Sequence, residues 1–133
     1  MREITVLCVE DSDAFAYAMR LAVADLKVRL FRVVDGEQAM RFLRREKPYD
    51  QMPAPDLIFL DLNLPKQSGF DLLAELRTDP VLSRIPAVVL TSSNSPSDRK
   101  KSIELGAREY IMKPSDFERL TSEVAATCQR YVA

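Results

Sequence analysis

The sequence predicts an α/β fold built on one doubly wound, five-stranded parallel sheet with the strand order 2-1-3-4-5. Five short apolar runs rich in β-branched residues alternate with stretches of helical period, as in repeated βα units. The runs are apolar on both faces, as expected of parallel strands that helices cover from two sides. Right-handed crossovers leave few topologies, of which this order is a common one. The expected strands are Ile4–Val9, Val28–Val34, Asp56–Leu60, Ile85–Leu90 and Ala107–Met112.

The first two helices begin at polar residues. Ser12 or Asp13 can cap a helix after the first strand, because a side-chain oxygen there can accept from a free backbone N–H. The pair Asp35-Gly36 opens the second helix. The apolar residues that share one face are Phe15, Met19, Ala22 and Leu26 in the first helix, and Ala39, Phe42 and Leu43 in the second.

Proline and glycine mark the boundaries that follow. Three prolines make Lys47–Pro55 a loop, and a short helix is expected over Gly69–Arg77. A capping box with Pro96 at the first helical position opens a helix over Pro96–Leu105, and Gly106 ends it. The last helix begins near Ser115. The expected inward residues are Leu72, Leu73 and Leu76 in the third helix, and Phe117, Leu120, Val124, Cys128 and Tyr131 in the last.

Length and composition indicate one globular domain over residues 1–133, with no output domain. Hydrophobic residues make up 47% and charged residues 29%, and the formal net charge is −1. The basic excess of a nucleic-acid-binding protein is absent, the apolar runs are too short to cross a bilayer, and the start is not a secretory signal. We therefore expect a cytoplasmic protein that binds neither nucleic acid nor membrane.

The numbers and positions of cysteine and histidine restrict the catalytic and metal sites that the chain can contain. Cys8 and Cys128 have neither a zinc-site spacing nor the pattern of a disulfide framework, so we expect both to be small buried residues. The chain has no histidine, which excludes Ser-His and Cys-His catalysis and most zinc sites.

Polar residues follow four of the five expected strands. Ligands of an open α/β sheet bind beyond the carboxyl ends of its strands, at the switch point between the first and third strands. Glu10 and Asp11 follow the first strand, and Asp61 follows the third. Thr91 follows the fourth strand and Lys113 the fifth. Three carboxylates, a hydroxyl and an amine therefore converge at one edge of the sheet.

Each residue alone has an ordinary structural explanation. Asp11 fits a helix cap, and Asp61 fits a turn. Thr91 fits the start of a loop, and Lys113 fits a solvated lysine. Together they need another explanation, because carboxylates clustered at the end of a buried sheet repel one another. A divalent cation removes that repulsion, and oxygen-only ligands favour Mg²⁺, with Mn²⁺ as the alternative, over zinc.

This set of groups suits phosphoryl transfer to a carboxylate. An oxygen of Asp61 can attack phosphorus to form an acyl phosphate, while the metal, Lys113 and Thr91 stabilise the equatorial oxygens. The chain contains neither a GxxxxGKS/T loop nor GxGxxG. We therefore expect the phosphoryl group to arrive on another molecule, not on bound ATP.

Four motifs in this order resemble the receiver family of response regulators, whose fold is CheY-like or flavodoxin-like. They are VEDS at Val9–Ser12, DLIFLDLNLPKQSGFDLL at Asp56–Leu73, VVLTSS at Val88–Ser93 and YIMKP at Tyr110–Pro114. The likeness spans essentially the whole chain. Within the family, the start of the chain, the DLNLP run and the proline-containing loop are most similar to those of single-domain regulators paired with phytochrome-type histidine kinases.

The resemblance implies a two-component phosphorelay in which a histidine kinase phosphorylates Asp61 in a Mg²⁺-dependent reaction. Thr91 would be the switch hydroxyl, Lys113 the phosphate-binding amine, and Tyr110 the switch aromatic, whose ring turns inward on phosphorylation. The chain would then be a signalling switch that catalyses only its own phosphorylation and dephosphorylation, not an enzyme acting on other substrates.

The resemblance also implies a metal pocket made of Glu10, Asp11 and Asp61. Asp11 and the main-chain carbonyl of Asn63 would bind the metal directly. Glu10 stands where aspartate is commoner in the family, so its contact with the metal is expected to run through water.

The resemblance implies that the signal passes to a downstream protein or a phosphotransfer partner. Receivers of this kind use the face made by the helix Pro96–Leu105, the fifth strand and the last helix for targets or homodimers. Opposite charges there could pair across a two-fold axis, with solvated surface charges as the alternative. These charges are Arg99, Lys100 and Lys101 on one helix, and Asp116, Glu118 and Glu123 on the other.

Three other interpretations are weaker. A phosphatase of the haloacid dehalogenase type would need a second acid where Asn63 stands. A flavodoxin-like FMN-binding protein would need a phosphate-binding first loop, and Glu10-Asp11 would repel a phosphate there. A degenerate receiver used only for docking would not be phosphorylated.

Overall fold

The computed structural model describes residues 2–131, and its five strands and five helices alternate along the chain. The strands are β1 (Ile4–Val9), β2 (Val28–Val33), β3 (Leu57–Leu60), β4 (Ala87–Thr91) and β5 (Glu109–Met112). The helices are α1 (Asp13–Ala22), α2 (Gly36–Leu43), α3 (Gly69–Thr78), α4 (Pro96–Glu104) and α5 (Phe117–Arg130), with a short 3₁₀ turn, η1 (Leu82–Arg84).

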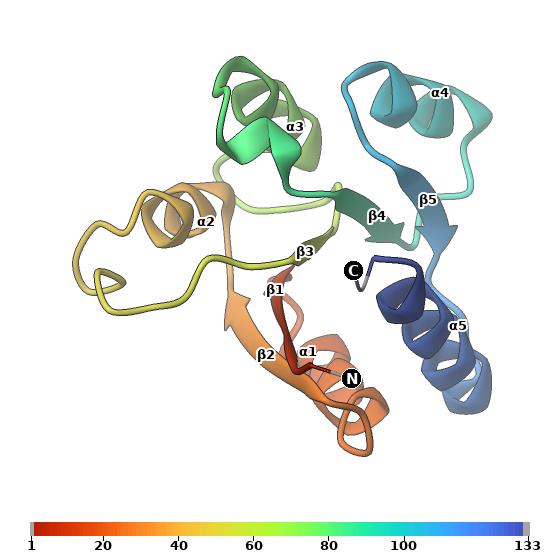
Figure 1. Ribbon diagram of the computed structural model, residues 1–133. Helices are drawn as coiled ribbons and strands as arrows, with labels where there is room; N and C mark the ends of the chain where they lie inside the picture. Colours follow the sequence, from red (N-terminus) through yellow and green to blue (C-terminus); the bar gives the residue numbers. More distant parts are fainter. Residues whose placement is uncertain (1, 132–133) are drawn as a thin grey trace.

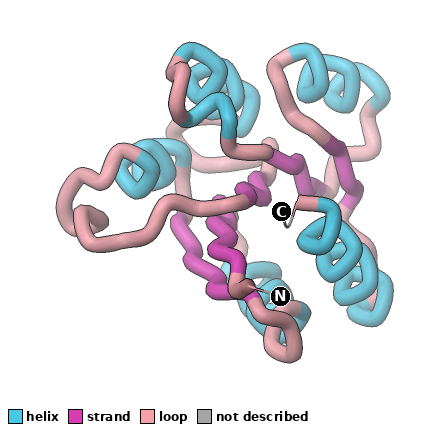
Figure 2. Tube along the Cα trace, in the orientation of Figure 1, coloured by secondary structure: helices cyan, strands magenta, loops and turns pink. Residues whose placement is uncertain are grey.

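All strand pairs are parallel, and the sheet order is β2-β1-β3-β4-β5. Helices α2, α3 and α4 cover one face of the sheet, and α1 and α5 cover the other (Figure 1). Figure 2 shows how loops join each strand to the next helix around the sheet. The predicted fold class and strand order are confirmed.

Strand boundaries differ from the prediction at five places. The second strand ends at Val33 and not at Val34, and the third begins at Leu57 and not at Asp56. The fourth strand begins at Ala87 and not at Ile85, because the N–H of Ile85 donates to Leu82 (3.1 Å) and closes η1, which was not predicted. The same strand extends through Thr91, whose carbonyl accepts from the N–H of Lys113 (2.6 Å). The fifth strand begins only at Glu109.

Every α-helix follows a side-chain cap; the sequence predicts this for α1, α2 and α4, whereas the cap of α3 was not predicted. The oxygen of Ser12, not Asp13, accepts from the N–H of Phe15 (3.2 Å), so Asp13 becomes the first helical residue of α1. In α5 the cap is Asp116, one residue beyond Ser115. The remaining caps are Asp35 for α2, Ser68 for α3 and Ser95 for α4.

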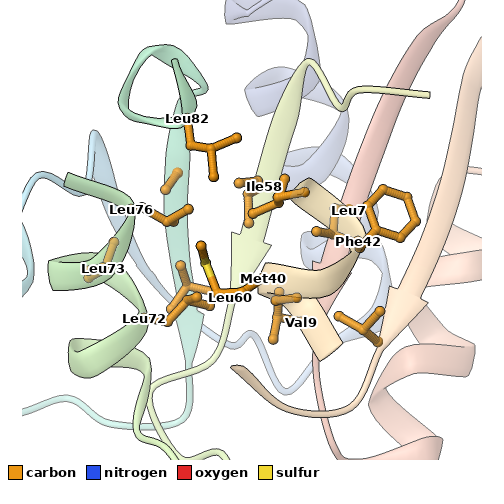
Figure 3. Packing of buried hydrophobic residues seen from close by; sticks show 14 of the residues in the cluster. Leu7, Val9, Met40, Phe42, Ile58, Leu60, Leu72, Leu73, Leu76 and Leu82 are labelled. Carbon is orange, nitrogen blue, oxygen red and sulfur yellow. The ribbon is translucent and has the colours of Figure 1, made fainter. Parts of the chain in front are cut away.

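Two apolar clusters hold the layers together, because successive strand residues point to opposite faces. The α2–α3 cluster contains strand and helix residues that meet in Figure 3: Leu7, Val9, Met40, Phe42, Ile58, Leu60, Leu72, Leu73, Leu76 and Leu82. The α1–α5 cluster contains Ile4, Val6, Cys8, Met19, Ala22, Val23, Leu57, Phe59, Val88, Leu90, Leu120, Val124 and Cys128.

Both cysteines are buried and free, as predicted, and burial raises the pKa of Cys8 to about 12 and that of Cys128 to about 11. The expectation for Phe117 is wrong: its side chain is 46% exposed. Phe117 is the first residue of α5, and the buried face of that helix begins only at Leu120. Within residues 2–131, none of the helices combines the length and the apolar character that a membrane span needs.

Gly69 lets helix α3 start directly against the strand that ends at the site. A Cβ atom at Gly69 would collide with the main-chain oxygen of Asp61 and lie 2.8 Å from the Cα of Leu62. At Gly36, the first residue of α2, a Cβ would meet only the far end of the flexible Gln67 side chain.

Replacing Gly69 with alanine should therefore lower the free energy of unfolding by about 1–3 kcal/mol, because backbone atoms must move. Gly36→Ala is the matched control and should stay within about 1 kcal/mol of the wild type, since Gln67 can move aside. Urea denaturation measures both. Equal losses would show that the contact with Asp61 is not the cause.

Candidate functional site

Asp61 lies directly after β3 at the carboxyl edge of the sheet, and its side chain is buried. Its N–H donates to the carbonyl of Val9 (3.1 Å), which extends the β1–β3 pairing by one residue. The hydroxyl of Thr91 donates to Oδ1 (2.8 Å), and the amine of Lys113 donates to Oδ2 (2.9 Å). Both carboxylate oxygens of Asp61 are therefore held by donors from β4 and the end of β5.

Lys113 is the centre of a buried group of charges. Its amine lies 2.8 Å from Oε1 of Glu10 and 2.9 Å from Oδ2 of Asp61, and 4.2 Å from the centre of the Phe15 ring. The Lys113 side chain is only 15% exposed. Burial acts to lower the pKa of Lys113, but hydrogen bonds to Glu10 and Asp61 outweigh it, so that pKa lies above its ordinary value. Lys113 stays protonated and holds two carboxylates together.

Glu10 is almost completely buried, and burial raises the pKa of its carboxyl group. Its hydrogen bonds to Lys113 and to the N–H of Ser12 (3.0 Å) partly offset that effect. The sequence predicts Glu10 for the acidic pocket, but its pairing with Lys113 was not predicted. Both Glu10 oxygens thus already have partners.

The carboxylate oxygens of Glu10, Asp11 and Asp61 come within 4.8 Å of one another, which is close enough to bind one metal ion. Asp11 is exposed, whereas the other two are buried. The N–H of Asn63 donates to Oδ1 of Asp61 (3.2 Å), so Asn63 lies beside the cluster. The predicted metal contact of its carbonyl stays a prediction. An all-oxygen donor set fits Mg²⁺ or Mn²⁺.

Tyr110 lies beside the site in β5 and packs against the α2–α3 cluster. Its hydroxyl donates to the carbonyl of Ser93 (2.8 Å), and the guanidinium of Arg99 lies 6.0 Å from the ring centre. The hydroxyl thus ties the ring to the loop after β4, and the inward turn of Tyr110 on phosphorylation stays a prediction.

The structure brings all the predicted site residues to one edge of the sheet, and it adds two that were missed. Ser93 donates from its hydroxyl to Oδ2 of Asp98 (2.6 Å) and holds Tyr110 through its carbonyl. Phe15 was predicted only as a core residue, but its ring lies against the Lys113 amine. Neither role has a sequence signal, because both depend on side chains from distant elements.

Comparisons with known proteins agree with this geometry. The family model described as response regulator receiver domain matches residues 6–125. The response regulator Rcp1 of Synechocystis sp. is 40% identical over 117 residues, which cover 86% of this chain and 80% of that protein. The chain spans about half the length of several other curated relatives.

Solved structures give the same result. The phosphorylated cyanobacterial phytochrome response regulator RcpA superposes with a TM-score of 0.90 at 37% identity, covering 97% of this chain and 94% of that chain. The Mn²⁺-bound form of Rcp1 has a TM-score of 0.84 at 38% identity, covering 92% and 90% of the two chains.

Replacing Lys113 with methionine should lower the free energy of unfolding by about 3–5 kcal/mol near pH 8, because buried Glu10 and Asp61 lose their counter-ion. The loss should be smaller near pH 5. Without Lys113 the pKa of folded Glu10 rises further above that of the unfolded chain. Protonation then stabilises the folded state below the unfolded pKa, and this stability is lost as the pH rises.

Urea denaturation at the two pH values measures the effect. Lys100→Met, at an exposed lysine of α4, is the control and should change stability by less than about 0.5 kcal/mol. A loss that does not depend on pH would show that the unpaired carboxylates are not its cause.

Proposed function

The chain belongs to the response regulator receiver family, and we propose that it accepts a phosphoryl group on Asp61 from a histidine kinase. One observation carries this proposal. The Asp61 carboxylate is buried at the carboxyl edge of the sheet, with a lysine amine and a threonine hydroxyl on its two oxygens. These are the donors that a phosphoryl group on Asp61 would meet.

The proposed transfer is a displacement at phosphorus. An oxygen of Asp61 attacks the phosphorus of a phosphohistidine, the new O–P bond forms, and the P–N bond breaks with its electron pair going to the imidazole nitrogen. Lys113 and Thr91 donate hydrogen bonds to the phosphoryl oxygens as negative charge collects there. The chain itself needs no ATP site.

The donor set fits a divalent cation, Mg²⁺ or Mn²⁺, and the related Rcp1 has been solved with Mn²⁺. Asp11, Asp61 and the carbonyl of Asn63 would hold the ion directly. Glu10 would contact it through water, since Lys113 and Ser12 already bind its two oxygens. When bound, the cation supplies positive charge that reduces repulsion between Asp61 and the incoming phosphoryl group.

The similarity to RcpA, a cyanobacterial phytochrome response regulator, supports a phytochrome-type kinase as the phosphoryl donor. The output would be a downstream protein or phosphotransfer partner that recognises the phosphorylated form. The chemistry is limited to the phosphorylation and dephosphorylation of Asp61. The cytoplasmic location expected from the sequence stays a prediction.

Incubation with acetyl phosphate and Mg²⁺ should add one phosphoryl group per chain, seen as a shift in intact mass. Asp61→Asn should abolish the shift because an amide is a poor nucleophile, and chelation of the metal should abolish it too. Asp71→Asn, at an exposed acid of α3, is the control and should leave labelling unchanged. Labelling that persists in Asp61→Asn would place the acceptor elsewhere and refute the proposal.

We also propose that phosphorylation favours a homodimer through the face made by α4, β5 and α5. Three large apolar side chains are exposed on these elements: Ile103 (46%), Met112 (52%) and Phe117 (46%). The expected charge pairing needs one revision, because the Lys101 amine lies 4.4 Å from the Phe70 ring of α3 and so points away from β5. Arg99 and Lys100 are then the cations available to the acidic residues of α5.

Sedimentation with and without beryllofluoride, at low and high salt, tests the dimer. Beryllofluoride should raise the dimer fraction, and high salt should lower it if charge pairs contribute. Met112→Glu should prevent dimer formation, whereas Val81→Glu should not. Val81 is 69% exposed but lies beside η1, away from this face. A monomer under all four conditions would leave a partner protein as the reader of this face.

A further inference from the structure

Arg32 on β2 reaches from the sheet to the loop that carries Glu10 and Asp11. It is paired in register with Cys8, on the side of the sheet that α1 and α5 cover. Its Nε donates to the carbonyl of Glu10 (2.8 Å), and its Nη1 donates to Oδ1 of Asp13 (2.8 Å). The Arg32 side chain is only 22% exposed. One guanidinium thus binds the chain on both sides of Asp11.

The bond to the Glu10 carbonyl constrains Asp11 directly. That carbonyl belongs to the peptide unit that joins Glu10 to Asp11. Because the unit is planar, holding its oxygen also fixes the orientation of the N–H and Cα of Asp11. The N–H of Glu10 is also held, by the carbonyl of Val33 (3.0 Å). On the far side, Asp13 is the first residue of α1. These bonds hold the backbone on both sides of the exposed residue Asp11.

This arrangement has a cost to folding. Among the residues that the structure describes, Nη2 of Arg32 is one of two buried side-chain atoms without a hydrogen-bond partner. A buried donor without a partner lowers the stability of the fold. The Nε of Arg32 nevertheless stabilises the loop, because without it the carbonyl of Glu10 would lose this donor. An apolar side chain would avoid the unpaired Nη2 but could not hold the Glu10 carbonyl and Asp13, so what arginine adds at this position is its hold on the loop that carries Asp11.

We propose that Arg32 is a positioning residue for the metal site, which holds Asp11 in the orientation that binds the cation. The proposal rests on the proposed function, because it assumes that Asp11 is a metal ligand. A simple charge effect has the opposite sign: a nearby guanidinium repels a cation, so its removal would strengthen metal binding. The direction of the change in affinity thus distinguishes positioning from charge.

Titration calorimetry with Mg²⁺ on the intact chain tests the proposal. Arg32→Met should weaken Mg²⁺ binding roughly tenfold, the lower end of the range for residues that orient metal ligands. Arg32→Lys should also weaken it, because lysine keeps the charge but cannot hold the two acceptors with one planar fork. Arg32→Met should also lose some stability, because the carbonyl of Glu10 loses a donor, so urea denaturation without Mg²⁺ must show that both variants are folded under the titration conditions.

Two further variants complete the test. Arg29→Met is the matched control on the same strand, since Arg29 is 52% exposed and its nearest acid, Glu3, is 4.0 Å away; its Mg²⁺ affinity should be unchanged. Asp13→Ala should weaken binding less than Arg32→Met and should add nothing to it in the double variant, because both changes remove the same link.

Unchanged or tighter Mg²⁺ binding by Arg32→Met would overturn the positioning role, while the proposed function would stand if the wild type binds Mg²⁺ and Asp11→Ala does not. A loss of stability without a loss of affinity would make Arg32 purely structural. Absence of Mg²⁺ binding by the wild type would overturn both proposals.

Discussion

The site depends on one physical constraint: two buried carboxylates must share one buried amine. Glu10 and Asp61 both contact the Lys113 amine within 2.9 Å, in a place that water barely reaches. Removing such charges from water is expensive, and only close pairing with further hydrogen bonds compensates for it. Thr91, Ser12 and Asn63 supply those additional bonds. The group still carries one excess negative charge, and exposed Asp11 adds another, so the edge of the sheet is left attractive to a cation.

The parallel sheet is what makes this arrangement possible. The carboxyl ends of parallel strands meet at one edge, so residues distant in sequence arrive together without any long connection. β1 and β3 are buried in the middle of the sheet and carry the acids, whereas β5 lies at its border and carries the lysine. A long lysine side chain can cross from the border to the centre, which a shorter cation-bearing residue could not do. Gly69 then allows α3 to close over the backbone of Asp61.

Much of the fold and of the site could be predicted from the sequence. The spacing of apolar residues and the helix caps are local signals, and the order of the elements they define determines which residues meet at the carboxyl edge of the sheet. Asp35 and Ser95 are recognisable as helix caps from their residue types and positions. The alternation of strands and helices is by itself enough to place Asp11, Asp61 and Lys113 at the carboxyl edge of the sheet. The partners of long side chains could not be predicted, since they depend on packing between distant elements. The Lys113–Glu10 pair, the reach of Arg32 and the contact of Lys101 with Phe70 are of this kind. The start of β4 was misplaced for a related reason: Ile85 is apolar and β-branched, but its N–H is used by η1.

The same bonds that stabilise Asp61 also connect it to the surface proposed for signalling. The Thr91 hydroxyl donates to Asp61 and accepts from the N–H of Ser93 (3.4 Å), and the carbonyl of Ser93 accepts from Tyr110. Tyr110 in turn lies beside Arg99 of α4 and next to the exposed face of β5. A phosphoryl group on Asp61 adds negative charge and new acceptors within reach of Thr91 and Lys113. The Thr91 hydroxyl, which would meet these new acceptors, also contacts Ser93, the residue whose carbonyl accepts from the Tyr110 hydroxyl. The chain of contacts is short because β4 and β5 are adjacent, and it runs from the buried edge of the sheet to the proposed α4–β5–α5 face.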